Sequence, residues 1–129
     1  MKTYTLKRIG QLLFTTGAVQ GKTAVADFTS LVDTGSTYTI LPFEHLLTIG
    51  YEPLLAEKKV RIITASGLVY APKFKLDWIS CFGVQLNSFS VVAHTLPSNL
   101  SGFGILGMDF LRPARVQIDV FCGVISLNR

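Results

Sequence analysis

Residues 30–37 of this chain read Ser30-Leu31-Val32-Asp33-Thr34-Gly35-Ser36-Thr37. It places one carboxylate directly after a short apolar strand, on a turn made by Thr and Gly. The apolar run at residues 38–41 follows at once, so the turn is expected to lie between two buried strands. Desolvating an unpaired carboxylate costs more than a small fold can supply, so Asp33 must be hydrogen-bonded, paired or functional. Taken alone, an Asp in such a turn is by default a satisfied turn or cap residue.

Length and composition limit the class of protein. The 129 residues suit a single domain at 1–129 with one hydrophobic core. Apolar residues make up 49% and charged residues only 16%, which indicates an apolar surface covered by a partner. The net charge of +4 comes from scattered basic residues with no block of five, so the sequence predicts no nucleic-acid-binding patch.

The cysteines and the N-terminal segment bear on location. Cys81 and Cys122 match no metal or redox spacing, and we expect both to be buried thiols in a reducing compartment. The apolar run at residues 12–14 is too short for the core of a signal peptide. No stretch approaches the roughly 20 apolar residues of a membrane helix, so the sequence predicts a soluble, cytoplasmic protein without a membrane span.

The first half of the chain has mostly the pattern of β-strands. Residues 1–32 alternate polar with apolar or β-branched side chains, and the strand at residues 38–41 ends at Pro42. A short helix is predicted at residues 43–49, which Gly50 would end. The fold is therefore expected to be mostly β.

Two hairpins are expected in the middle of the chain. The first covers residues 60–79, with a Gly-containing turn at its tip, and such an arm often projects from the body of a protein. The second is expected to join strands at residues 82–86 and 89–93 through Asn87-Ser88. Further on, the patterns predict a strand at 103–107, a short helix at 108–111, and strands at 116–120 and 124–127.

Several of these features together resemble one enzyme family. Asp33-Thr34-Gly35-Ser36 resembles the active-site motif of aspartic proteases, although Asp-Thr-Gly alone is weak evidence. Ile105-Leu106-Gly107 resembles the second signature of the family, two hydrophobic residues and a glycine, and residues 107–127 are similar to the tail of the single-lobe branch. The chain from about residue 18 onward is thus similar to the retropepsin-like (single-lobe, clan AA) aspartic proteases of bacterial or cellular type. The resemblance implies a mostly β, closed acid-protease half-barrel with a projecting flap hairpin and one or two short helices, dimeric.

The chemistry of this family requires two carboxylates that share one proton, one acting as base towards a water and the other as acid towards the scissile carbonyl. This chain has a single Asp-Thr-Gly, and its other aspartates, Asp27, Asp77, Asp109 and Asp119, do not repeat the motif. The second carboxylate is therefore expected from a second copy in a C2 homodimer. The resemblance then implies an aspartic endopeptidase that hydrolyses extended peptides without metal or cofactor.

Catalytic roles follow from the resemblance residue by residue. Asp33 would be the catalytic carboxylate, and Thr34 would hydrogen-bond across the two-fold axis to the partner's backbone. Gly35 would let the backbone approach the water and the substrate, where a Cβ would obstruct them. The hydroxyl of Ser36 could donate to the carboxylate and lower the pKa of the pair.

The resemblance also implies substrate-binding residues. The expected subsite walls are apolar side chains beside the motif and in the second signature, and the expected flap tip closes over an extended peptide. The residues expected to bind substrate are Leu31, Ser36, Ile40, Ser66, Gly67, Leu68 and Ile105.

Two positions depart from the pattern of retroviral enzymes. Those enzymes carry an acidic residue just after the motif, paired with an arginine after the second signature, and here the matching residues are Thr37 and Met108. The ion pair is therefore absent, which puts the strength of the dimer and the polar edge of the substrate groove in question.

Two alternative functions remain open on the sequence. One is a non-catalytic retropepsin-fold dimerisation or peptide-binding module, because a shift of about 1 Å could disable a complete site. The other is an enzyme restricted to its own precursor or one partner. Structural roles are the simplest for the remaining residues: Trp78 and the nine Phe in the core, and His45 and His94 at the surface or an interface. Asp109 would cap a helix or pair with Arg112, and Asp119 would pair with Arg115 or with a partner chain.

Overall fold

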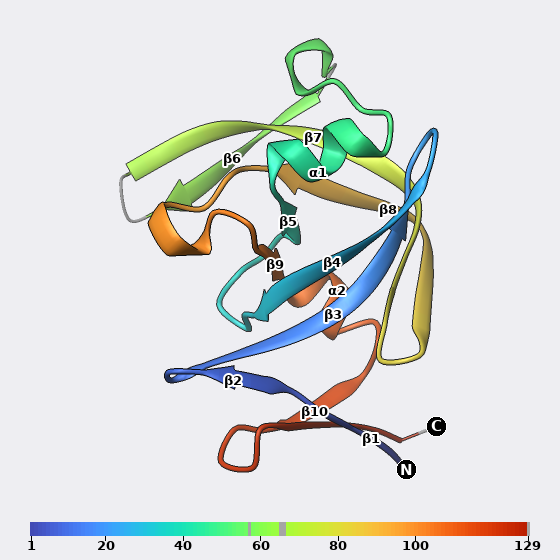
Figure 1. The fold of residues 1–129 in the computed structure, drawn as a ribbon, viewed down its shortest axis with the longest axis vertical. Coiled ribbons are helices and arrows are strands. Elements are labelled where there is room, and N and C mark those ends of the chain that lie inside the picture. Colours follow the sequence, from blue (N-terminus) through green and yellow to red (C-terminus); the bar gives the residue numbers. More distant parts are fainter. Residues whose placement is uncertain (57, 65–66, 129) are drawn as a thin grey trace.

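The computed structural model describes residues 1–56, 58–64 and 67–128. The strands are β1 (Lys2–Thr5), β2 (Lys7–Ile9), β3 (Leu12–Gln20), β4 (Val25–Val32), β5 (Ile40–Leu41), β6 (Lys58–Thr64), β7 (Gly67–Cys81), β8 (Val84–Ala93), β9 (Gly104–Leu106), β10 (Val116–Asp119) and β11 (Val124–Leu127). The helices are α1 (Phe43–Thr48) and α2 (Met108–Leu111), with 3₁₀ turns η1 (Pro53–Leu55) and η2 (Ser98–Leu100). The prediction of a mostly β fold is confirmed (Figure 1).

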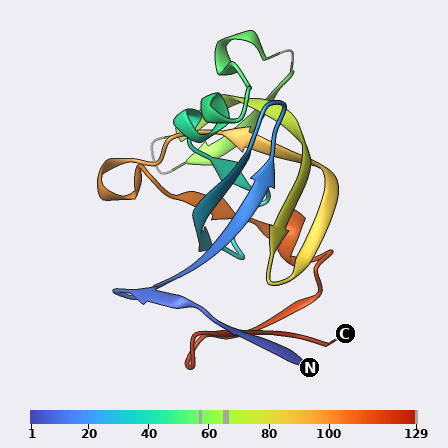
Figure 2. The same cartoon turned by 45° about the vertical axis from the view of Figure 1, so that its right-hand side comes forward.

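The strands form two sheets. The larger has the order β2-β3-β4-β9-β5-β8-β7-β6, and an additional pairing of β3 with β7 closes part of it on itself. This closure is the half-barrel expected from the sequence. The smaller sheet has the order β1-β11-β10 and brings both ends of the chain together at the bottom of the molecule (Figures 1 and 2).

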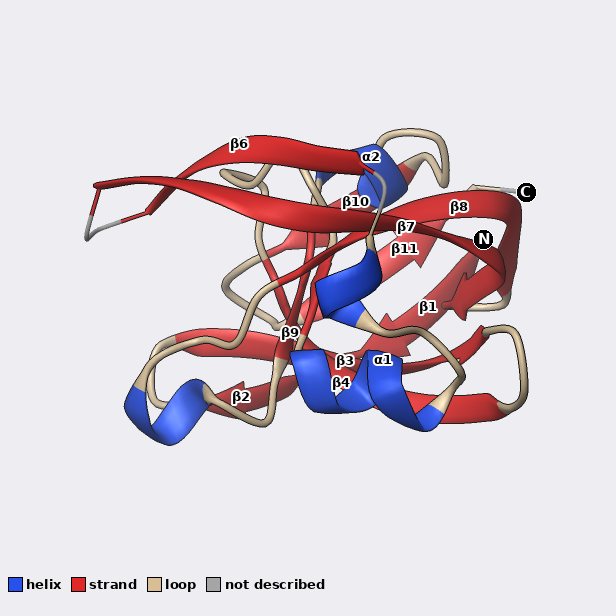
Figure 3. Cartoon of the chain, turned by 90° about the horizontal axis from the view of Figure 1, so that it is seen from above, coloured by secondary structure: helices blue, strands red, loops and turns tan. Residues whose placement is uncertain are grey.

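The hydrophobic core has two parts. The main cluster fills the interior of the half-barrel and includes Leu46 and Ile49 of the helical segment, both fully buried. A smaller cluster of Ile40, Ile62, Ala71 and Val92 joins the β6–β7 hairpin to β5 and β8. Seen from above, this hairpin extends beyond the rest of the chain, as predicted (Figure 3). Apolar contacts therefore attach the hairpin to the rest of the fold.

The helix and the hairpin turn give one confirmation and one correction. Helix α1 begins after Pro42 and is followed by Gly50 at a φ of 98°, as predicted. The predicted second hairpin through Asn87-Ser88 is wrong, because β8 is one continuous strand paired along β7. The turn lies instead at Phe82 and Gly83, whose φ values of 55° and 69° suit the tight two-residue turns that match the twist of antiparallel strands.

Two expectations about burial are also wrong in part. Cys81 is buried as expected, but Cys122 is exposed in the turn between β10 and β11. Phe121 beside it is 91% exposed, although aromatic side chains were expected in the core. Both side chains are exposed because they lie in the turn between β10 and β11, where the path of the backbone determines exposure and the residue type does not.

Candidate active site

The strand that leads to Asp33 is held by the second signature segment. β4 and β9 pair in parallel, with Leu31 opposite Ile105 and Val32 opposite Leu106. The backbone N–H of Asp33 then donates to the carbonyl of Leu106 at 3.0 Å. Two segments far apart in the sequence therefore fix where the motif turn begins.

The turn itself is a short, hydrogen-bonded loop around the carboxylate. The N–H of Gly35 donates to Oδ1 of Asp33 at 2.9 Å, and the N–H of Ser36 donates to the carbonyl of Asp33 at 3.2 Å. Asp33 is half-buried, while Thr34 and Gly35 are exposed. An Asp side chain that bonds to the backbone two residues on is a common way to stabilise a turn. Here the bond also orients the carboxylate.

Ser36 holds the far side of the turn in place through two hydrogen bonds. Its carbonyl accepts from the N–H of Met108 at 2.8 Å, and its hydroxyl donates to the carbonyl of Tyr38 at 2.7 Å. A hydroxyl has one proton to donate, so the expectation that Ser36 donates to the Asp33 carboxylate is wrong in this structure. Gly107 lies so close that a Cβ there would be 2.5 Å from the Tyr38 carbonyl oxygen. Only glycine fits at this position.

Asp109 joins the two signature segments in a way that the sequence did not predict. Its carboxylate accepts from both the N–H and the hydroxyl of Thr39, rather than capping a helix or pairing with Arg112. The Thr39 hydroxyl in turn accepts from the N–H of Gly107 at 3.1 Å. Burial raises the pKa of Asp109, and the hydrogen bonds from Thr39 oppose this shift. The sequence showed only that Asp109 lies in the first helical turn after Gly107, a position that favoured the interpretation as a helix cap.

A groove with a volume of about 760 Å³ opens beside the Asp33 carboxylate. Its walls come from the motif loop, the outer half of the β6–β7 hairpin, the loop after β8, and β9. The lining residues are Asp33, Gly35, Ser36, Thr37, Tyr38, Ile40, Arg61, Ile62, Ile63, Val69, His94, Thr95, Leu96, Pro97 and Ile105. The groove is therefore mostly apolar, with a carboxylate at one side.

The groove includes only some of the residues expected to bind substrate. Ser36, Ile40 and Ile105 line it, whereas Leu31 is not among its lining residues. Gly67 and Leu68 are exposed at the start of β7, outside the groove, and Ser66 lies outside the described residues.

Sequence reasoning missed other lining residues. Tyr38, Val69 and Leu96 carried no motif, and only the fold brings them together. His94, expected at the surface or an interface, is half-buried in the groove wall, and His45 is half-buried on α1.

A family model described as "gag-polyprotein putative aspartyl protease" matches residues 15–113, more than half of the chain. The chain belongs to this aspartyl protease family. No curated protein matches the sequence.

Solved structures agree with the family. The chain is similar to a retropepsin-like aspartic protease from Rickettsia conorii, with 18% identity and a TM-score of 0.76, over 98% of this chain and 90% of that one. It is also similar to the EIAV protease complexed with the inhibitor HBY-793, with 20% identity and a TM-score of 0.55, over 72% of this chain and 82% of that one. At these identities the likeness shows the fold. The aspartyl protease chain therefore has the retropepsin-like fold.

Two further properties of this aspartyl protease concern metal binding and membrane-spanning helices. No group of three or more His, Cys, Asp or Glu residues stands at metal-binding distance within residues 1–56, 58–64 and 67–128. In the part of the chain that the structure describes, no helix is long and apolar enough to cross a membrane.

Proposed function

We propose that the protein is an aspartic endopeptidase that works as a homodimer, with Asp33 of each copy forming the catalytic pair. One observation carries the proposal: the half-buried Asp33 carboxylate lies beside an apolar groove on a turn whose next two residues, Thr34 and Gly35, are exposed. An exposed turn leaves room for the same turn of a second copy. A two-fold axis beside Asp33 would then bring two carboxylates together.

The proposed mechanism uses the two carboxylates in different protonation states. Two like charges at short distance cannot both ionise easily, so the pair shares one proton and titrates as a unit. The ionised carboxylate takes a proton from a water, which attacks the scissile carbonyl, while the protonated one donates to the carbonyl oxygen. Gly35 would hold one carboxylate oxygen through its N–H, and Thr34 would link the two turns across the axis.

The proposed substrate is an extended peptide with apolar side chains near the cleaved bond. Ile40, Ile62 and Ile105 give the groove its apolar wall, and burying such side chains favours binding by about 25 cal/mol per Å². Gly67 and Leu68, together with Ser66, would form a flap tip that closes over the peptide and excludes water. Leu31, in β4, does not line the groove and would support the substrate-binding residues from the strand that precedes the motif. We place the enzyme in the cytoplasm, without metal or cofactor.

Digestion of a peptide library at pH values from acid to neutral tests the proposal. Wild-type protein, first shown to be dimeric, is expected to cleave a defined set of peptides, and Asp33→Asn is expected to lose this cleavage. Cleavage of a single precursor-like peptide alone would identify a processing-restricted enzyme. Absence of cleavage by a verified dimer at every pH would contradict the proposal and leave a non-catalytic dimerisation or peptide-binding module.

A further inference from the structure

Two basic side chains line the groove together with Asp33. These are Arg61, which is exposed, and His94, which is half-buried. Among the described residues, neither side chain has an ion-pair or hydrogen-bond partner. Their nitrogen atoms can therefore bind a ligand without breaking a contact of the fold.

The pattern of burial along β8 directs His94 towards the groove. Val91 and Ala93 belong to the main core cluster, whereas Val92 belongs to the smaller one. The N–H of His94 donates to the carbonyl of Leu41 at 3.1 Å, so the pairing with β5 continues as far as this residue. Successive residues of a strand point to opposite faces, which places His94 on the same face as Val92. The imidazole therefore continues the apolar wall of the groove as a polar group.

His94 lies several strands away from Asp33. Asp33 follows β4 and His94 follows β8, and the strand order between them is β4-β9-β5-β8. Neighbouring strands are about 4.8 Å apart, so three spacings across the sheet amount to about 14 Å. An extended peptide covers this distance in about four residues. A substrate side chain that meets His94 would therefore come from a residue about two to four positions from the bond held at Asp33.

The hairpin that lines the groove carries a concentrated positive charge. Residues 58–76 contain five basic side chains and no acidic one, although the net charge of the whole chain is only +4. Lys58 and Lys73 are directly opposite each other, and like charges in this arrangement repel. Figure 3 shows that the hairpin extends beyond the rest of the chain. Its charge therefore favours the approach of an anionic ligand to the groove.

We propose that the groove selects peptides with an acidic side chain about two to four residues from the cleaved bond, and that His94 binds this carboxylate. The inference rests on the proposed function, because it takes the groove as the substrate site. Asp33 repels a second carboxylate near the cleaved bond, so apolar side chains bind there and the acidic one binds farther away. Arg61, which alternates with the buried Ile62 along β6, adds positive charge from the hairpin.

The selection depends on pH through the imidazole. A protonated imidazole donates a charge-assisted hydrogen bond to a carboxylate, which is stronger than a neutral one. The other charged or titratable groups that line the groove or lie on elements beside His94 are Asp33, Tyr38, Glu44, Arg61 and Lys73. Among these residue types only histidine ordinarily changes its charge between about pH 5 and 8. The preference for an acidic side chain is therefore strongest at the acidic end of this range.

Fluorescence anisotropy with matched octapeptides tests this inference. Each pair of peptides has apolar residues at its centre and either Glu or Gln at one position, about two, three or four residues from the central bond. The protein is Asp33→Asn, which is expected not to cleave the peptides and has no carboxylate at residue 33 to titrate. At about pH 5.5 the Glu peptide of at least one pair should bind at least about fivefold more tightly than its Gln partner. At about pH 8 this preference should fall to about twofold, because only the fixed charges of the hairpin remain.

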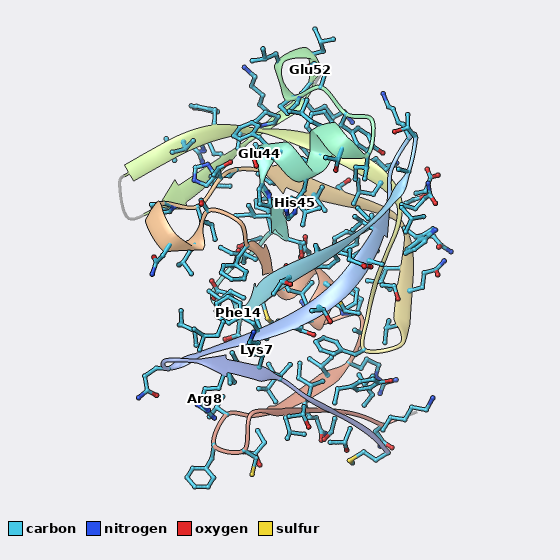
Figure 4. All side chains as sticks on the ribbon, in the orientation of Figure 1. Lys7, Arg8, Phe14, Glu44, His45 and Glu52 are labelled. Atoms are coloured by element: carbon cyan, nitrogen blue, oxygen red, sulfur yellow. The ribbon has the colours of Figure 1, made fainter. Side chains whose placement is uncertain are left out.

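His94→Gln and His45→Gln, each added to Asp33→Asn, form a matched pair of variants. Both histidines are half-buried, but His45 lies on α1, where Figure 4 labels it, and does not line the groove. His94→Gln is expected to reduce the preference at pH 5.5 to about twofold and to make it independent of pH. His45→Gln should leave the preference unchanged. The Gln peptides should bind all variants equally, which shows that the groove is intact, and circular dichroism checks the fold.

The outcomes separate this inference from the proposed function. Failure of every peptide to bind, equal binding of every Glu and Gln pair, or a preference that His94→Gln leaves unchanged would each overturn the inference. A preference that depends on His94, in a protein whose wild type cleaves no peptide, would overturn the proposed function and leave a groove that binds acidic peptides. Cleavage by the wild type with equal kcat/KM for the Glu and Gln peptides would support the proposed function and overturn this inference.

Discussion

The carboxylate of Asp109 accepts two hydrogen bonds from Thr39, one from the backbone N–H at 2.9 Å and one from the hydroxyl at 2.7 Å. Thr39 is fully buried, so neither bond competes with water. Because the same hydroxyl accepts from the N–H of Gly107, one buried side chain joins the loop after Asp33 to the second signature segment. The position of the Asp33 turn therefore depends on Thr39, which is not among the residues that line the groove.

Replacing Thr39 by Val keeps the shape of the side chain and removes its hydroxyl. The N–H of Gly107 then loses its acceptor and one oxygen of Asp109 its donor, which costs about 1–3 kcal/mol for each buried group left unpaired. We expect Thr39→Val to lower the free energy of unfolding by at least about 2 kcal/mol, measured by urea denaturation. Thr37→Val is the control, since Thr37 is exposed, and equal stability of the two variants would contradict the role of the Thr39 hydroxyl.

The raised pKa of Asp109 predicts the sign of a pH effect. Burial holds the pKa of this group above 3.8 in the folded chain, so the folded state binds the proton more tightly than the unfolded state. The stabilisation from this group is therefore fully present below pH 3.8 and is lost as pH rises through the folded pKa. The free energy of unfolding, wild type minus Asp109→Asn, should fall as pH rises through this range.

Asp119 provides the opposite case for comparison. Its Oδ1 accepts from the N–H of Cys122 at 3.0 Å, not from Arg115 as the sequence suggested, and this bond lowers its pKa. The difference between wild type and Asp119→Asn should therefore fall as pH drops below 3.8. The same pH dependence for both aspartates would show that one of the two assignments is wrong.

Gly107 is predicted to tolerate no side chain. A Cβ there would lie 2.5 Å from the Tyr38 carbonyl oxygen and 2.9 Å from that of Ser36, and both are backbone atoms that cannot move away easily. Gly107→Ala should cost about 1–3 kcal/mol or more in unfolding free energy and reduce peptide cleavage. Gly102→Ala is the matched control, because a Cβ at Gly102 would meet nothing within 4 Å. A thermal melt of both variants with equal midpoints would contradict the prediction.

Ser36→Ala tests where the hydroxyl of the motif acts. The hydroxyl donates to the Tyr38 carbonyl at 2.7 Å, so its loss should cost about 1 kcal/mol of stability. The pH profile of cleavage should stay the same, because the hydroxyl is not directed at Asp33. A shift of the acidic limb in a kcat/KM profile would show instead that the hydroxyl tunes the carboxylate pair.

Local sequence patterns predicted the strands and α1 well, because alternation and the flanking Pro42 and Gly50 act over a few residues. The patterns failed where two nearby dipeptides were equally suited to form a turn. Phe82-Gly83 and Asn87-Ser88 can both turn, and only the long pairing of β7 with β8 decides between them. Phe121 was expected in the core, since a residue type does not say which way a hairpin turn points.

The candidate site was predictable only as far as its motif. Asp33, Ser36, Ile40 and Ile105 lie where the groove is, since the motif loop and the second signature carry them. Asp109 was missed because its partner, Thr39, is distant in sequence and no local pattern joins them. The remaining groove residues come from β6, β7 and the loop after β8, which meet only after the half-barrel closes.

The parallel pairing of β4 with β9 also sets the order in which the site can form. The N–H of Asp33 has its acceptor in Leu106, and Thr39 has its partner in Asp109, so both depend on residues synthesised long after the motif. Pairings between distant segments form late in folding. A growing chain on the ribosome would therefore carry an unformed Asp33 turn until residues 106–109 have emerged, and we expect no peptide cleavage by the chain before that point.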